Sequence, residues 1–204
     1  ALSVRCVKGI IEKNFTVAHG RIEKTSTKEK LNRLWLADDA ISMFIDAKGD
    51  ANSFTLKSGA GSNSATFEGT VPAEGDEYVA FYPTTITQSV TETSGTYSVN
   101  FTMPQRQNVT AAGEINATAL PMLGYTTDTE IAMKNVGSLL ELGLKTKDGT
   151  ANVVKIELQG NDNEKLSGAF AVEVKKDGTQ PVAVVSGEAS DADKTLTVNC
   201  GAYE

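Results

Sequence analysis

Short segments in which apolar and polar residues alternate recur along this chain and constrain its fold more than any other feature. In residues 152–159, which read NVVKIELQ, Val154, Ile156 and Leu158 fall on one face, and charged or amide side chains fall on the other. This two-residue period is typical of a β-strand with one buried face. The same alternation is found in residues 97–102, 169–175 and 195–200. The pattern therefore predicts strands in all four segments.

Turn-forming residues separate the alternating segments at short intervals. Gly, Asn and Asp are favoured in turns because they tolerate the positive φ angles of tight reversals. Such clusters lie at residues 48–50, 58–63, 74–76, 94–95, 147–150, 160–163 and 176–179. Residues 152–159 and 169–175 flank one of these turns and are predicted to be antiparallel neighbours. Strands at this spacing predict an all-β fold, an antiparallel β-sandwich.

Helical periodicity is weak throughout the chain. The best helix candidates are residues 27–34 and 111–120, and both are short. No linker and no internal repeat is visible, so residues 1–204 are predicted to form a single domain.

Charge and hydropathy exclude some classes of function. The net charge of -7 and the pI near 4.9 oppose binding to nucleic acid, which depends on cationic contacts to phosphate. No apolar run approaches the roughly 20 residues that a membrane-spanning helix needs. Ala1 does not begin a signal-peptide pattern, so for an exported protein we expect the targeting segment to lie outside this sequence.

Residues that carry chemistry are sparse. His19 is the single histidine, and the nucleophile-elbow, phosphate-loop and Cys-x-x-Cys motifs are missing. Asp38 and Asp39 are adjacent, and neighbours along a strand point to opposite faces, which does not suit a glycosidase acid/base pair. The acidic clusters at residues 46–52 and 161–164 lack the calcium-loop spacing and are predicted to be hairpin turns. We expect no enzymatic activity, no cofactor and no metal site.

Two cysteines, Cys6 and Cys200, lie near opposite ends of the chain. First and last strands are neighbours in many sandwiches, so a Cys6–Cys200 disulfide is one interpretation, with a stabilising effect of about 4–5 kcal/mol. Two separate buried thiols are the other. Lipidation of Cys6 is disfavoured, because Arg5 stands where a lipoprotein signal usually has a small residue.

A series of motifs resembles a known family. Residues 35–44 read WLADDAISMF, residues 78–83 read YVAFYP and residues 120–124 read LPMLG. Further on, residues 134–140 read KNVGSLL, followed by VKIELQGN at 154–161 and LSG at 166–168. In this order, from about residue 35 to residue 201, they resemble the amino-terminal domain of fimbrillin-like proteins, the surface pilus subunits and lipoproteins of Bacteroides-type bacteria.

The resemblance implies a Greek-key, transthyretin-like sandwich, with the usual carboxy-terminal domain absent from this sequence. It implies a non-enzymatic structural or adhesive protein of the cell surface, outer membrane or fimbrium. Its precursor would be held by a lipid anchor rather than a transmembrane helix, and its partners would be other fimbrial subunits and host or bacterial surface ligands. Family subunits assemble by strand exchange after proteolysis behind an arginine, and Arg21 and Arg33 occupy suitable positions for that cleavage.

A glycan-binding module of a surface protein is the alternative. β-Sandwiches often present aromatic platforms to sugars, and Trp35, Tyr78, Phe81 and Tyr82 are the candidates here. Their place in strand patterns favours core positions instead.

Overall fold

The computed structural model describes residues 10–18, 20, 22–24, 31–73, 75–108, 115–140, 142–144, 147, 153–162, 164–177, 182–185 and 188–200. The two helices among these residues are single 3-10 turns, η1 (Thr84–Ile86) and η2 (Ala117–Ala119). The prediction of an all-β fold with at most short helices is confirmed. The helix predicted over residues 27–34 is wrong in its described part, because Leu31–Arg33 forms a strand. Of the helix predicted over residues 111–120, the described residues 115–120 contain only the 3-10 turn η2.

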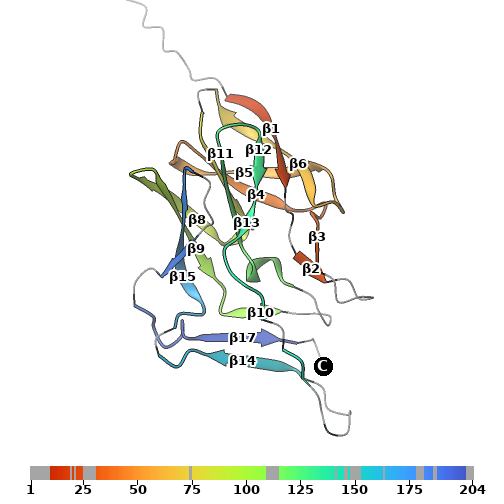
Figure 1. Ribbon diagram of the computed structural model, residues 1–204, viewed down its shortest axis with the longest axis vertical. Coiled ribbons are helices and arrows are strands. Elements are labelled where there is room, and N and C mark those ends of the chain that lie inside the picture. Colours follow the sequence, from red (N-terminus) through yellow and green to blue (C-terminus); the bar gives the residue numbers. More distant parts are fainter. Residues whose placement is uncertain are drawn as a thin grey trace, which may run out of the picture.

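The described strands form four sheets (Figure 1). The large sheet has the order β12 (Glu130–Ala132), β1 (Ile10–Ala18), β6 (Ser64–Pro72), β5 (Lys48–Ser58), β4 (Ala40–Ile45), β7 (Tyr78–Tyr82), β11 (Met122–Thr126), β13 (Lys134–Asn135). The four-stranded sheet has the order β16 (Val182–Val185), β15 (Gly168–Lys175), β9 (Thr96–Met103), β8 (Thr87–Thr93). The three-stranded sheet has the order β10 (Arg106–Asn108), β17 (Thr195–Asn199), β14 (Lys155–Gln159), and β2 (Ile22–Lys24) pairs with β3 (Leu31–Arg33).

Among the described strands, pairing is antiparallel with two exceptions. β1 lies parallel to β12, and β10 lies parallel to β17. The strands predicted at residues 97–102, 169–175 and 195–200 correspond to β9, β15 and β17. The Greek-key connectivity stays a prediction.

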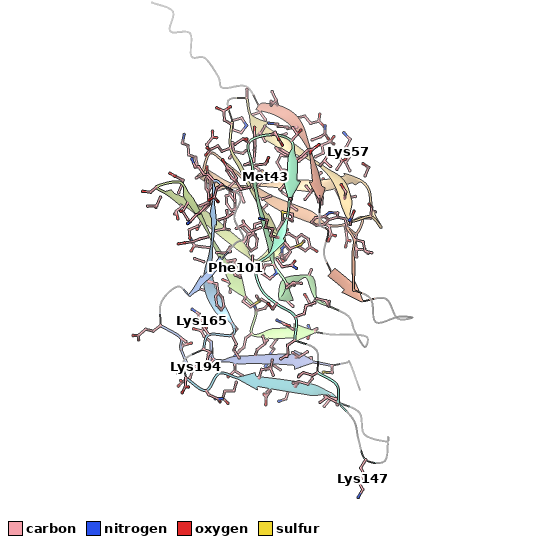
Figure 2. All side chains as sticks on the ribbon, in the orientation of Figure 1. Met43, Lys57, Phe101, Lys147, Lys165 and Lys194 are labelled. Carbon is pink, nitrogen blue, oxygen red and sulfur yellow. The ribbon has the colours of Figure 1, made fainter. Side chains whose placement is uncertain are left out.

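A sandwich core fills the space between the large sheet and the four-stranded sheet. The large sheet contributes Phe44, Val79, Phe81 and Leu123, and the four-stranded sheet contributes Val90, Tyr97, Val99, Phe101, Val172 and Val174. Figure 2 shows Phe101 between the two sheets. Two sheets packed face to face over alternating apolar side chains make the β-sandwich that the sequence predicts.

A second core lies on the other face of the large sheet. β7 serves both cores, because Tyr78, Ala80 and Tyr82 point into the second core while Val79 and Phe81 point into the first. All five residues of β7 are buried. The large sheet curls around this second core until β11 packs against β12, where a Cβ on Gly124 would lie 2.6 Å from the Ile131 side chain.

Of two hairpin turns predicted from the sequence, one is confirmed and the other lies two residues earlier than predicted. The β8–β9 hairpin turns at Ser94 and Gly95, as predicted, and both residues have positive φ. The β4–β5 hairpin turns at Asp46 and Ala47, whose φ angles are 51° and 50°. The turn predicted at residues 48–50 is therefore two residues late, because Lys48 already pairs with Ile45.

The predicted pairing between residues 152–159 and 169–175 is wrong. β14 pairs with β17, and β15 pairs with β9 and β16. The connecting segment bonds to the turn before β17 instead of folding back as a hairpin. Leu166 N donates to Asp193 O and Gly160 N donates to Lys194 O, each at 2.8 Å.

Candidate functional site

Strand β1 lies in a slot between β6 and β12 (Figure 1). All nine of its residues pair antiparallel with β6, from Ile10 opposite Pro72 to Ala18 opposite Ser64. Only Thr16–Ala18 also pair with β12. Residues 10–15 thus have one strand neighbour among the described residues, and the main chain of β1 is held mainly by β6.

The side chains of β1 anchor it at one end. Phe15 and Val17 are fully buried in the second core, whereas Ile10 and Ile11 are 75% and 44% exposed. The Phe15 ring packs against Phe54 and Tyr78 at centroid distances of 5.4 and 4.8 Å. Taking Phe15 and Val17 out of the slot would expose this aromatic cluster to water, at a cost of about 1.5–3 kcal/mol for each side chain.

Trp35 closes the slot at the end where β1 stops. Its indole Nε1 donates to the Val17 carbonyl at 3.1 Å, and its ring packs on Phe67 and Tyr82. The Trp35 side chain is fully buried, although Trp35 precedes β4 rather than forming part of a strand. The loop before β4 therefore fixes the exit of β1.

The predicted cleavage residues lie next to this slot in the sequence. Gly20 N donates to Asn63 O at 2.9 Å, and a Cβ on Gly20 would lie 2.8 Å from the Leu34 main chain. His19 and Arg21 lie outside the described residues. Arg33 ends β3, opposite Ile22 of β2, and its side chain is outside the described part.

The cysteine pairing stays a prediction, since Cys6 lies outside the described residues. Cys200 is half-buried just after β17, with its Sγ 3.7 Å from the Val198 carbonyl.

A shallow cavity of about 250 Å³ lies beside Asp39 and the Tyr82-Pro83 cis peptide. Asp39 is 7% exposed, and its two carboxylate oxygens accept from the Leu36 N–H and the Tyr82 hydroxyl, each at 2.7 Å. Asp38 is exposed. Asp39 thus stabilises its own loop, a role that the sequence does not reveal because adjacent acidic residues look alike without knowledge of burial.

The four aromatics proposed as a glycan platform are all buried. Trp35 and Phe81 have no exposed surface, and Tyr78 and Tyr82 are 1% and 2% exposed. A side chain with no accessible face cannot stack on a sugar. The platform interpretation is therefore wrong for these residues.

The acidic clusters considered for calcium have other contacts. Asp46 Oδ1 accepts from the main-chain N–H groups of Asp76 and Glu77, at 3.1 and 3.0 Å, which ties the β4–β5 turn to the segment before β7. The turn predicted over residues 46–52 is therefore only partly confirmed, because residues 48–52 belong to β5. Glu164 Oε2 accepts from the Asp162 N–H at 2.7 Å, in a connection that forms no hairpin. No group of three potential metal-ligating side chains occurs among the described residues.

An ion cluster joins the start of β7 to the four-stranded sheet. Glu77 accepts hydrogen bonds from the Tyr97 hydroxyl and the Lys176 ammonium, with Lys176 Nζ 2.8 Å from Oε2. The Lys176 contact and then the Tyr97 contact hold the pKa of Glu77 below its usual value of 4.5. Burial, followed by the Glu77 carboxylate, raises the pKa of Tyr97.

Replacing Glu77 with Gln is expected to change how stability depends on pH. Because the folded pKa of Glu77 lies below 4.5, its stabilising effect is present above that pH and lost as pH falls through the folded value. We expect E77Q to lose about 1.5 kcal/mol at pH 7, the lower end of the range for a hydrogen bond to a charged group, because the Glu77 side chain is 28% exposed. Urea unfolding at pH 7 and pH 3, with exposed E157Q as control, checks this. A difference from wild type that stays constant with pH would contradict it.

Comparisons with known proteins add nothing to this geometry: no family model, no curated protein and no solved structure matches the chain. None of the helices in the described part of the chain has the length and apolar character needed to cross a bilayer.

Proposed function

We propose that the protein is a non-enzymatic structural and adhesive protein of the cell surface, a fimbrial subunit or fimbrillin-like lipoprotein that assembles by strand exchange. The position of β1 carries this proposal. An amino-terminal strand that lies along β6 over nine residue pairs, with an apolar anchor at one end, is a strand that another copy can replace.

The energetics of the slot support exchange. Main-chain hydrogen bonds to β6 provide affinity that does not depend on sequence, and the alternate side chains Phe15 and Val17 fix the register. An emptied slot would expose the β6 edge and the aromatic surface around Phe54 and Tyr78. Exposed edges of this kind pair readily with a strand from another chain.

Arg21 follows β1 by three residues. Cleavage behind Arg21 would separate β1 from the rest of the chain, whereas cleavage behind Arg33 would also separate β2 and β3. Cleavage behind Arg21 would therefore open the slot and leave β2 and β3 attached to the rest of the chain. The partners would then be other fimbrial subunits and surface ligands, at the outer membrane or in a fimbrium, with a lipid anchor in the precursor.

An arginine-specific protease tests the proposal on the folded protein. We expect a cut behind Arg21, release of the β1 peptide, and self-association of the cut protein measured by light scattering. A synthetic peptide with the sequence of residues 10–18 should block self-association, and the same peptide with Phe15 and Val17 replaced by Ser should not. Arg21→Gln is the matched control. Resistance at both arginines, or a cut protein that stays monomeric and binds no peptide, would overturn the proposal.

A further inference from the structure

Lys13 points inward from β1, toward the second core. Lys13, Phe15 and Val17 alternate along the strand and therefore share one face. Phe15 and Val17 are fully buried and Lys13 is half-buried, whereas the residues between them are exposed. A charged group turned toward a core costs free energy unless neighbouring groups receive it. The rest of the slot must therefore provide a position for this ammonium group.

The ring and hydroxyl of Tyr78 receive the Lys13 ammonium. Nζ lies 4.1 Å from the centroid of the Tyr78 ring and 5.3 Å from that of the Phe15 ring. Nζ also donates to the Tyr78 hydroxyl at 2.5 Å, and that hydroxyl donates to the Gly75 carbonyl. An ammonium over an aromatic face is attracted by the electron-rich ring, most strongly where water is excluded. Tyr78 is 1% exposed, so this attraction is well shielded from solvent.

The position that receives the cation is built from strands other than β1. Tyr78 begins β7, and β6, β5 and β4 lie between β7 and β1 in the large sheet. On β6, Gly69 lies opposite Lys13, and a Cβ on Gly69 would lie 2.7 Å from the Phe54 ring. The Phe54 ring thus occupies the place of a side chain opposite Lys13. Because none of these residues belongs to β1, the aromatic position for a cation is a property of the slot.

The charge of Lys13 also fixes the register of the strand. A slip of one residue would turn every side chain to the opposite face, which the apolar pattern alone opposes. A slip of two residues keeps the faces, and in one direction it would bring Lys13 to the place of Phe15, which has no exposed surface. Burying an ammonium group there without a partner is costly. Lys13 therefore opposes a slip that alternation alone would allow.

The outward face of β1 makes a weaker contact. Asn14 Oδ1 accepts from Lys57 Nζ at 3.3 Å, and Lys57 also pairs with Glu68. Lys57 lies at the outer surface of the large sheet (Figure 2), and its side chain is 50% exposed. Exposed polar pairs of this kind contribute little to affinity. Selection between strands therefore depends on the inward face.

We propose, on the basis of the strand exchange proposed above, that the slot selects the strand it accepts by a cation and that Lys13 is the residue that determines this specificity. The accepted strand has Lys or Arg, an aromatic residue two positions later and a β-branched aliphatic residue two positions after that. Residues 10–18 of a second copy of this chain have this pattern. A strand with an acidic residue in place of Lys13 is rejected, because its carboxylate would meet the negative face of the Tyr78 ring.

Labelled peptides with the sequence of residues 10–18 test the selection. Their binding to the arginine-protease-cut protein is measured by fluorescence anisotropy. We expect K13M to bind about tenfold more weakly than the wild-type peptide, since it keeps the stem and loses the charge. K13E should bind more weakly still, and K13R should stay within about threefold, because a guanidinium also stacks on aromatic faces. N14A is the matched control and should bind like the wild-type peptide.

The outcomes separate this inference from the proposed function. Equal binding of the wild-type, K13M and K13E peptides would overturn the selection and leave strand exchange intact. Binding of no peptide at all would overturn strand exchange itself, and the selection with it. A cut protein that carries Tyr78→Phe keeps the ring and loses the hydroxyl, so its preference for the wild-type peptide over K13M should shrink. An unchanged preference would remove the hydroxyl from the selection.

Hydrogen exchange on the uncut protein provides a readout that needs neither cleavage nor peptide binding. In full-length K13E, the amides that β1 donates to β6 should exchange several-fold faster than in the wild-type protein, while the β9 amides stay unchanged. K13R and N14A should leave the β1 amides as they are. Equal protection of β1 in K13E and the wild-type protein would mean that the slot does not distinguish a cation from an anion, which overturns the proposal.

Discussion

Replacing Phe15 with Ala is expected to lower the free energy of unfolding by about 3–5 kcal/mol, the range for removal of a fully buried aromatic side chain. Phe15 has no exposed surface and packs edge-on against Phe54 and Tyr78. Its loss leaves a cavity between β1 and the second core. Urea unfolding followed by circular dichroism measures the change.

The position of Phe15 in β1 adds a second expectation. The strand should loosen before the rest of the molecule does, so the amides that β1 donates to β6 should lose exchange protection more than those of β4 and β7. Ile11→Ala is the control, because Ile11 is 44% exposed in the same strand and should change stability by less than about 1 kcal/mol. Equal effects of the two substitutions would mean that β1 has no apolar anchor.

Replacing Asp39 with Ala is expected to cost about 2–4 kcal/mol. The substitution removes an acceptor from the Tyr82 hydroxyl and from the Leu36 N–H, and the Tyr82 hydroxyl is buried. A buried donor left without an acceptor costs about 1–3 kcal/mol, and hydrogen bonds to charged groups lie at the upper end of the range. Thermal or urea unfolding of D39A checks this result.

Asp38 provides a matched control for this prediction. Asp38 is exposed in the turn beside Asp39, so D38A should alter stability by no more than about 0.5 kcal/mol. D39N keeps an acceptor for one donor and should recover part of the loss. If D38A and D39A are equally destabilising, the effect comes from net charge rather than from the two hydrogen bonds.

The sequence predicts individual strands well, because alternation is a local property. In β14 the side chains of Ile156 and Leu158 are half-buried and those of Lys155, Glu157 and Gln159 are exposed, as the pattern indicates. Partner choice is different, because it depends on contacts between residues far apart in sequence. β14 pairs with β17 across some 40 residues rather than with its neighbour β15, and alternation in β14 contains no information about that choice.

The same distinction applies to the candidate site. Phe15 and Val17 alternate at the end of β1, so a signal for a buried strand was present in the sequence. The slot itself requires β6 and β12, which lie about 50 and 115 residues further along the chain. The sequence identifies Asp39 only as one of two adjacent acidic residues, because its burial depends on Tyr82, which reaches it from β7.

The long pairing of β1 with β6 also has a mechanical consequence. A pull along the axis of β1 acts on all nine residue pairs at the same time, because the hydrogen bonds lie across the direction of force. A pull at right angles to the strand would instead open the pairs one after another, beginning at the exposed end near Ile10. A fibre in which neighbouring subunits are joined by such a strand would therefore resist tension along its length far better than peeling from the side.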